Sequence, residues 1–444
     1  MGPFDAPAWP DRLPGRYWLA DVHVPRALRE APANAARVAL LVEDGAIAAV
    51  EGTPSGDAPV FQLQGATALP AFVDVHTHLD KGDLLAMGLS AADTLRDAVD
   101  VARADYQHWS DDELRHRIVF GLRTAYAHGI RALNTHCDWP QPHGNAAWRV
   151  LQALRAEWKG RVDLHVTALV DTADFGDADR AGTIARTVAA GRGRLGLFVY
   201  PGVRPQDLRQ AFTEAQRHGL VLDLHVDEHL APAITHLPLI AQLAREHGLA
   251  GRVLCSHACV LSVLPEDERG RVLDQLAEAR IGLVALPYTN LYLQDAGRHD
   301  GLRRTPRLRG LLPVHEARRR GIALAFAADN HRDPFFPAGD LDPLQLLALA
   351  TLAAQLDDPL ADWSDTITRA PAQMLGLAWD GLLRAGAPAD LVLHPGRSNA
   401  EVLARAATGR QVLRAGQRLT PGEAALPDFR ELDGLRRPGS RSMS

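Results

Sequence analysis

The segment FVDVHTHLDKG, residues 72–82, places two histidines where an apolar strand gives way to a polar turn. Residues two apart in a strand project from the same face, so His76 and His78 are predicted to point to one spot. Taken alone, such a pair is often no more than polar residues in a turn. The pattern along the rest of the chain decides between a turn and a functional site.

Eight strand-like segments recur along the chain, and amphipathic helical stretches separate most of them. The segments are FVDVHTH (72–78), RALNTHCD (131–138), VDLHVTALVD (162–171), LGLFVY (195–200), LVLDLHVDE (220–228), RVLCSHA (252–258), IGLVALP (281–287) and IALAFAAD (322–329). Helical stretches such as DLRQAFTEAQRHG end in His-Gly, a helix C-cap signal. This alternation predicts an α/β fold, a parallel (β/α)8 TIM barrel whose active site lies at the carboxyl ends of the strands.

The two ends of the chain have a different, β-like character. YWLADVHV and RVALLVEDGAIAAVEG near the start read as strands around an acidic-Gly hairpin turn, and GAPADLVLHPG and RQVLRAGQRL near the end resemble them. We expect these segments to form a small β-sandwich domain. The predicted parts are 1–68 and 381–422 for the small domain, 69–380 for the barrel and 423–444 for a flexible, small and polar tail.

Composition excludes several classes of protein. The 444 residues suffice for a barrel with an appendage, and 46% apolar with 23% charged residues is ordinary for a soluble enzyme. The net charge of -6 offers no basic footprint for nucleic acid and no polybasic membrane anchor. Three cysteines, Cys137, Cys255 and Cys259, suit a reducing compartment rather than a disulfide framework.

No secretory signal opens the chain, and the apolar segment at 343–356 is too short to span a bilayer. We therefore expect a cytoplasmic enzyme whose partner is a small molecule, with neither nucleic acid nor a membrane involved. A homo-oligomer is the common state of such enzymes.

Polar residues stand at the ends of the predicted strands, where a barrel enzyme carries its site. They are His76, His78, His136, Asp171, His225, Glu228, His257 and Asp329. Strands buried in a barrel are expected to be apolar, so this set of His, Glu and Asp at one rim is hard to explain as packing.

Four of these residues suit one divalent metal ion with an open position for water. The predicted ligands are His76, His78, His225 and Asp329. Neutral imidazole favours zinc or ferrous iron, and the ion lowers the pKa of bound water from ~15.7 towards ~7. Each histidine alone is more often a core or rim residue, and it is the four together that favour a metal. Neither Lys81 nor Lys159 lies at the end of a mid-barrel strand to bridge two ions, so one ion is expected.

Two further residues are candidates for the chemistry. Glu228, three residues after His225 in HVDEH, is predicted to carry a proton from the metal-bound water to the leaving group, although an acid opening a helix would look the same. His257, in CSHAC, is predicted to hold the attacking hydroxide or the developing charge. Its alternative is a buried histidine between two small cysteines.

Taken together, four motifs resemble the amidohydrolase superfamily, and within it the cytosine deaminase branch. They are HTH after an apolar strand, HVDE, SH and FAADNHRDPFFPAGDLDPLQ. LPYTNLYLQD resembles the loop after strand seven of those enzymes, and the likeness runs from about Phe72 to the C-terminal ADLVL. The resemblance implies the same four metal ligands, a proton shuttle at Glu228, a hydroxide-orienting His257, and Asp329 as both ligand and base. It also places the aromatic that stacks on the base near Phe335, for which a hydrophobic plug of the loop is the alternative.

The departures from that branch bear on the substrate. Asp171 in ALVDTADF stands where cytosine deaminases have a glutamine that contacts the ring, and an ionised aspartate only accepts hydrogen bonds. Asn330 follows the metal aspartate in place of a second Asp, and both residues are predicted to contact the substrate. The DNHRD and HLDK segments also resemble relatives that remove N-alkylamines from triazine rings.

The predicted function is hydrolytic deamination of an amino-substituted nitrogen heterocycle, in which metal-bound hydroxide attacks the amino-bearing carbon and ammonia leaves. The retained Glu228 favours this reaction. The alternative is hydrolysis of an N-alkyl or amide C–N bond of a triazine-like ring by the same residues. A catalytically dead scaffold is disfavoured because all four predicted ligands are present.

Overall fold

The computed structural model describes residues 9–10, 12–30, 37–139, 146–299 and 302–435. By its internal contacts the chain divides into two compact units. One comprises residues 1–74, 122–132 and 341–427, and the other residues 75–121, 133–340 and 428–444. The domain boundaries predicted at residues 68, 380 and 422 stay a prediction.

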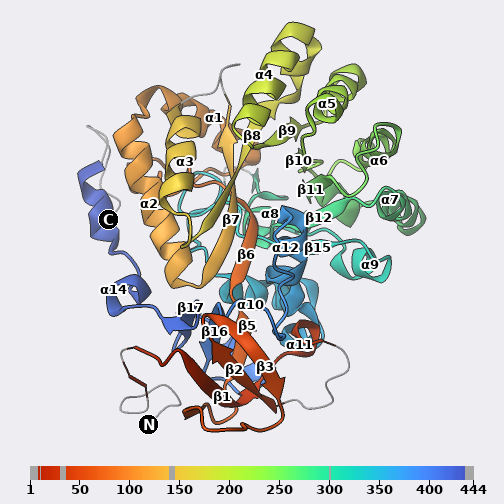
Figure 1. The fold of residues 1–444 in the computed structure, drawn as a ribbon. Coiled ribbons are helices and arrows are strands. Elements are labelled where there is room, and N and C mark those ends of the chain that lie inside the picture. The colour runs from red at the N-terminus through yellow and green to blue at the C-terminus, as the bar shows by residue number, and fades with distance from the viewer. Residues whose placement is uncertain (1–8, 11, 31–36, 140–145, 300–301, 436–444) are drawn as a thin grey trace. The chain divides into compact units, whose positions relative to one another are not determined.

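Eight parallel strands form the predicted barrel, and each lies within or close to one of the eight strand-like segments of the sequence (Figure 1). In spatial order they are β6 (Phe72–Thr77), β7 (Ile130–Asp138), β8 (Asp163–Asp171), β9 (Arg194–Val199), β10 (Leu222–Val226), β11 (Val253–His257), β12 (Gly282–Ala285) and β15 (Leu324–Phe326). A parallel bridge between Thr77 and Asp329 joins the two ends of this order at the carboxyl side. The barrel is thus closed at the rim that carries the predicted site.

Helices alternate with these strands and cover the outer side of the barrel (Figure 1). They are α2 (Asp111–Ala127), α3 (Ala146–Glu157), α4 (Ala178–Ala190), α5 (Pro205–His218), α6 (Leu237–Glu246), α7 (Glu266–Glu278) and α9 (Val314–Arg319). In α5, Pro205 occupies the first turn, where a missing N–H costs nothing, and Gly219 ends the helix at a φ of 66°. Leu208 and Phe212, one turn apart on the same helix face, are fully buried.

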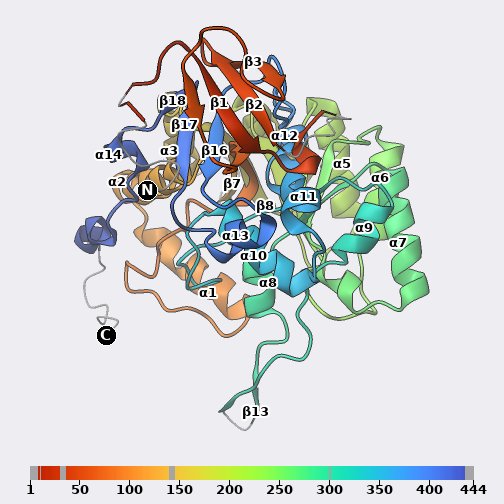
Figure 2. The same ribbon diagram turned by 90° about the horizontal axis from the view of Figure 1, so that it is seen from below.

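Two helices depart from the regular alternation at the carboxyl side of the strands. They are α1 (Leu95–Asp105), between β6 and α2, and α8 (Pro287–Leu293), after β12. After α8 the chain forms a small antiparallel ribbon of β13 (Arg298–His299) and β14 (Leu302–Arg303), which projects from the barrel in Figure 2.

The ends of the chain form a second eight-stranded sheet, as their β-like character predicted. Its strands are β1 (Arg16–His23), β2 (Arg37–Glu43), β3 (Ala46–Glu51), β4 (Val60–Gln62), β5 (Thr67–Pro70), β16 (Leu391–His394), β17 (Gln411–Arg414) and β18 (Gln417–Arg418). β5 pairs antiparallel with β16, which joins the N-terminal and C-terminal contributions into one sheet. At the β2–β3 hairpin, Asp44 and Gly45 have φ values of 49° and 80°, as a tight turn of this hand requires.

The same unit contains α10 (Pro343–Ala354), α11 (Pro359–Trp363), α12 (Arg369–Leu375), α13 (Asn399–Ala404) and α14 (Pro421–Ala424). Asp342 caps α10 by accepting a hydrogen bond from Leu344 N at 3.0 Å. Arg410 donates to both oxygens of that carboxylate, with Nη1 2.9 Å from Oδ1. Both side chains are buried, so the pair is held in a medium of low dielectric constant.

Replacing Arg410 with glutamine is expected to destabilise the protein by about 3–5 kcal/mol, because Asp342 is left as a buried charge without its partner. Burial acts to raise the pKa of Asp342, but the Arg410 guanidinium outweighs it and holds that pKa below its ordinary value. The pair's contribution is therefore present above the carboxyl's unfolded pKa and is lost as the pH falls through its lower folded pKa. Denaturant unfolding at several pH values measures this.

The matched control is R397Q, which removes an arginine from an exposed pair with Glu401. Little change in stability is expected there, because water and salt screen that pair. Equal effects of R410Q and R397Q at neutral pH would contradict the role given to the buried pair.

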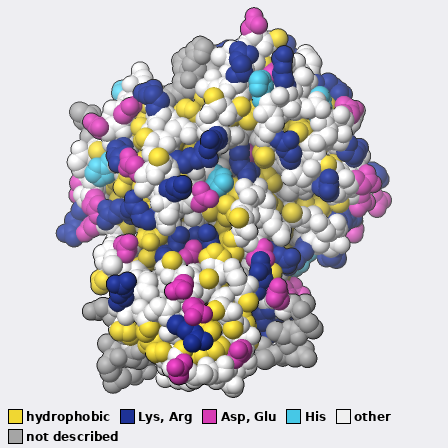
Figure 3. Space-filling model, viewed as in Figure 1, with side chains coloured by type: hydrophobic (Ala, Val, Ile, Leu, Met, Phe, Trp, Pro, Cys, Tyr) yellow, Lys and Arg dark blue, Asp and Glu magenta, His cyan; other side chains and the backbone are white. Residues whose placement is uncertain are grey.

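The C-terminal segment contains a helical turn in its described part. Phe429–Leu435 form a 3-10 helix, and Leu432 is buried against Leu84, Met87 and Phe120. The remainder of the predicted flexible tail, residues 436–444, lies outside the described residues. None of the helices in the described part of the chain combines the length and apolar content that crossing a membrane requires. On the face shown in Figure 3, acidic and basic side chains intermingle.

Candidate metal centre and cavity

The closure of the barrel positions Asp329 against the two histidines of the opening motif. Asp329 N donates to His76 O at 2.8 Å, and His78 N donates to Asp329 O at 3.2 Å. Asp329 has a φ of 60°, a left-handed conformation that is uncommon for a residue with a side chain. Such strain persists only where the surrounding structure imposes it, and it is common at functional sites.

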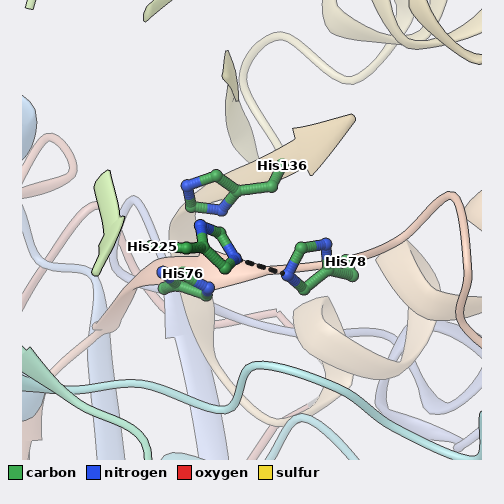
Figure 4. A group of neighbouring side chains, drawn as sticks. All are labelled: His76, His78, His136 and His225. Atoms are coloured by element: carbon green, nitrogen blue, oxygen red, sulfur yellow. Dashed lines mark hydrogen bonds between the residues drawn. The ribbon is translucent and has the colours of Figure 1, made fainter. Parts of the chain in front are cut away.

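The four predicted ligands lie together at this rim. His76 Nε2 and His78 Nε2 are each 3.3 Å from Asp329 Oδ1, and His78 Nε2 is 3.2 Å from His225 Nε2. Figure 4 shows the rings of His76, His78 and His225 turned toward one another, with the short contact between His78 and His225 dashed. Residues from β6, β10 and the segment after β15 thus converge on one point.

This geometry fits a small divalent cation. Ligands ~2.0–2.1 Å from a tetrahedral ion lie about 3.3 Å from one another, which matches the measured contacts. Burial lowers the pKa of His78 and of His225 well below the ordinary value, so both rings are neutral with lone pairs to donate. Burial acts to raise the pKa of Asp329, but contacts with His76 and His78 outweigh it and hold that carboxylate ionised. The described residues hold further candidate donors, since His136 and His257 each complete a group with some of these ligands.

Two side chains that the sequence analysis did not name, Ser256 and Asp223, contact histidines at this rim. Ser256 Oγ lies 2.9 Å from His76 Nδ1, and His136 Nε2 lies 3.3 Å from Asp223 Oδ1. A partner on the second ring nitrogen fixes the orientation of a ligating imidazole. The signal that pointed to His136 was its position at the end of the second strand, whereas Ser256 and Asp223 have no such signal.

Glu228 and His257 are in contact beside the cluster. Glu228 Oε1 is 3.3 Å from His257 Nδ1, and Asn290 Nδ2 donates to the same nitrogen at 2.9 Å. With Nδ1 accepting, the ring proton of neutral His257 is on Nε2. That nitrogen is buried and has no hydrogen-bond partner among the described residues. It is therefore a donor available to a ligand.

The pKa values of these two groups are displaced in opposite directions. Burial raises the pKa of Glu228 well above its ordinary value, and the nearby Asp329 carboxylate adds to the effect. Burial lowers the pKa of His257 to about 3, so its ring is neutral at pH 7. A carboxyl group with a raised pKa, beside a neutral imidazole, is suited to proton transfer.

A cavity of about 440 Å³ opens onto this cluster. His78, His225, Glu228, His257 and Asp329 line its inner end. Its apolar wall is formed by Leu95, Val99, Ala102, Trp139, Leu169, Val170, Phe198 and Phe335. A cavity of this size that combines an apolar wall with convergent polar groups is typical of a small-molecule site.

The three predicted substrate contacts all line this cavity. Phe335 is 8% exposed and belongs to a hydrophobic cluster with Ala98 and Leu293, which accords with the plugging alternative, while its stacking role stays a prediction. Asn330 Nδ2 donates to Asp333 Oδ2 at 2.7 Å. Asp171 is more exposed and accepts a hydrogen bond from Ala173 N at 3.0 Å.

One polar part of the cavity wall was missed by sequence reasoning. Lys81 Nζ donates to Asp138 Oδ1 at 2.9 Å, and Tyr106 OH donates to the other carboxylate oxygen. Asp138 N in turn donates to Asp80 Oδ2 at 3.0 Å. Lys81 lies in the quoted opening motif, but Asp138 belongs to β7 and Tyr106 follows α1, so the sequence alone did not join these three residues.

Comparisons with known proteins agree with this fold. A model of the amidohydrolase family matches residues 83–419. Pterin deaminase from Rhizobium rhizogenes is 36% identical over 407 residues, which are 89% of this chain and 90% of that protein.

Two solved structures share the fold. 5-Methylcytosine deaminase from Klebsiella pneumoniae has a TM-score of 0.77 at 23% identity, with 90% of this chain and 97% of that one covered. N-isopropylammelide isopropylaminohydrolase from Burkholderia multivorans has a TM-score of 0.74 at 24% identity, with 91% and 98% covered.

Proposed function

The chain belongs to the amidohydrolase family, hydrolases of C–N bonds, and we propose that it deaminates an amino-substituted nitrogen heterocycle. One observation carries this proposal. Asp329 and three histidines form a cluster of metal-ligand type, and the buried Glu228–His257 pair lies beside it in the wall of the same cavity. Hydrolysis of an aromatic C–N bond requires an activated water and a group that transfers protons, and a cation site with an adjacent proton carrier provides both.

His76, His78, His225 and Asp329 would hold one divalent ion, zinc or ferrous iron. When bound, such an ion lowers the pKa of water towards ~7 and so supplies hydroxide at neutral pH. The low pKa values of these histidines favour this role, because a protonated imidazole cannot donate a lone pair.

Glu228 takes a proton from the attacking water and delivers it to the departing amino group, which leaves as ammonia. Its raised pKa makes the carboxylate a stronger base than that of an exposed glutamate. His257, with its Nε2–H directed away from Glu228, donates to the oxygen that adds to the ring and stabilises its developing charge. Asp329 accepts a proton from the same oxygen and returns it to the ring nitrogen, so that the products are a neutral oxo ring and ammonia.

Phe335 provides a flat apolar face for the heterocycle, and Asn330 and Asp171 contact its edges. A cavity of about 440 Å³ accommodates one or two fused rings. The pterin deaminase likeness, at 36% identity, makes a pterin the first substrate to test.

The test is amine release by purified protein of measured metal content. The panel contains pterin, cytosine, isocytosine and aminotriazines, each beside its N-alkylated analogue. Ammonia from an unsubstituted amino ring, with about one ion per chain and loss of activity on chelation, is the expected result. Alkylamine from the analogues and no ammonia would instead assign the dealkylation reaction suggested by the triazine-like segments. Absence of turnover across the panel with metal bound would overturn both assignments.

A further inference from the structure

Lys81 is a buried cation in the wall of the cavity. Its side chain belongs to the turn after β6, is 4% exposed by residue, and lines the same cavity as Phe335 and the metal-type cluster. Nζ lies 5.0 Å from the centre of the Phe335 ring. Burial acts to lower the pKa of Lys81, but Asp138 and Asp80 outweigh it, so the ammonium group stays charged.

The structure around Lys81 fixes where its charge points. Asp138 accepts from Lys81 with one oxygen and from Tyr106 with the other, so each carboxylate oxygen has a donor that holds it in place. An ammonium group has three N–H donors. Among the described residues Asp138 Oδ1 is the hydrogen-bond acceptor of Lys81. Two donors therefore remain for a molecule in the cavity.

Stability alone gives little reason to keep this pair. A buried ion pair often contributes no more than well-packed apolar side chains of the same volume, because both charges lose their hydration. Phe335 lies beside Lys81 in the same wall, so a methionine at position 81 would have an apolar neighbour. A charged donor placed over an aromatic face has a clear use in binding, because it can donate a hydrogen bond to an acceptor atom at the edge of a stacked ring.

We propose that Lys81 is a specificity-determining residue that donates to an oxo group of the substrate ring, so that the enzyme selects amino heterocycles that also carry a carbonyl oxygen. This inference rests on the proposed deaminase function. It adds Lys81 as the residue that recognises the substrate and the ring oxo group as the feature that Lys81 recognises. Asp138 and Tyr106 are positioning residues that aim the ammonium group. The ring lies against Phe335, with its oxo edge at Lys81 and its amino-bearing carbon at the metal-type cluster.

The test compares paired substrates in paired variants. For a ring that releases ammonia, kcat/KM is measured with the ring and with its analogue lacking the oxygen, such as pterin and 2-aminopteridine or cytosine and 4-aminopyrimidine. K81M/D138N removes both charges and avoids leaving Asp138 unpaired. K159M is the matched control, because Lys159 is the only other lysine and is exposed.

Wild type and K159M are expected to share one ratio of oxo to deoxy substrate. In K81M/D138N that ratio should fall about 10- to 100-fold, the worth of one hydrogen bond to a charged group. The comparison between proteins cancels the intrinsic reactivity of the two rings. An unchanged ratio would overturn the role of Lys81 even if overall activity fell, while ammonia release by wild type would leave the deaminase function standing.

A second measurement does not depend on the variant folding. Protein labelled with 13C-lysine has two lysine side-chain signals, and K159M assigns them. The oxo-containing ring or its deaminated product should shift the Lys81 signal and leave that of Lys159 in place. Saturation of the cavity with no shift of the Lys81 signal would contradict the contact.

Discussion

Replacing His225 with alanine is expected to abolish metal binding and turnover together. His225 Nε2 is 3.2 Å from His78 Nε2, and its removal opens one side of the buried cluster. The metal content should fall from about one ion per chain to a small fraction. Without a cation the pKa of water returns towards ~15.7, so turnover should fall by at least about 10³-fold. Elemental analysis and amine release on the same preparation measure both effects.

The matched control is H165A, which removes a partly exposed histidine near the start of β8 that lies outside the cluster. It should keep its metal and its activity. Turnover retained by metal-free H225A would refute the metal-dependent mechanism. Metal retained with activity lost would show that His225 acts on the reaction rather than on the ion.

The barrel was readable from the sequence because its strands are short apolar runs with polar residues at their carboxyl ends. The run at 281–287, for example, contains β12 (Gly282–Ala285). Strand ends differ from the predicted ones by a few residues, since hydrogen bonding and not side-chain type sets where a strand stops. The convergence of His76, His78, His225 and Asp329 follows from topology, because parallel strands of a barrel deliver their ends to one rim.

The parts that the sequence did not reveal depend on contacts between distant residues. Lys81, Tyr106 and Asp138 belong to three separate segments, and their spacing in the sequence does not predict that they are in contact. Asn290 reaches His257 from α8, a helix outside the regular alternation. The left-handed backbone at His257, with a φ of 68°, was equally hidden, because local preference would place glycine or asparagine there.

Replacing Glu228 with glutamine is expected to separate chemistry from metal binding. Glutamine has the same shape and can still contact His257, but it cannot carry a proton. Turnover should fall by about 10²–10⁴-fold with the metal content unchanged, the usual worth of a general acid–base group. E246Q, in which an exposed glutamate of α6 is neutralised in the same way, is the control and should match wild type. Full activity in E228Q would remove Glu228 from the mechanism.

The same variant should be more stable than wild type at alkaline pH. Burial, with Asp329 nearby, raises the folded-state pKa of Glu228 well above its ordinary 4.5. The contribution of such a group to stability is fully present below its unfolded pKa and is lost as the pH rises through the folded pKa, because the folded chain must then bury a charge. Glutamine never pays this penalty. In metal-free protein the Tm of E228Q should therefore equal that of wild type below the ordinary pKa of 4.5 and exceed it increasingly as the pH rises above that value. A variant that is more stable but turns over more slowly would show that Glu228 serves catalysis although it destabilises the fold. A Tm below that of wild type at high pH would instead assign Glu228 a structural role.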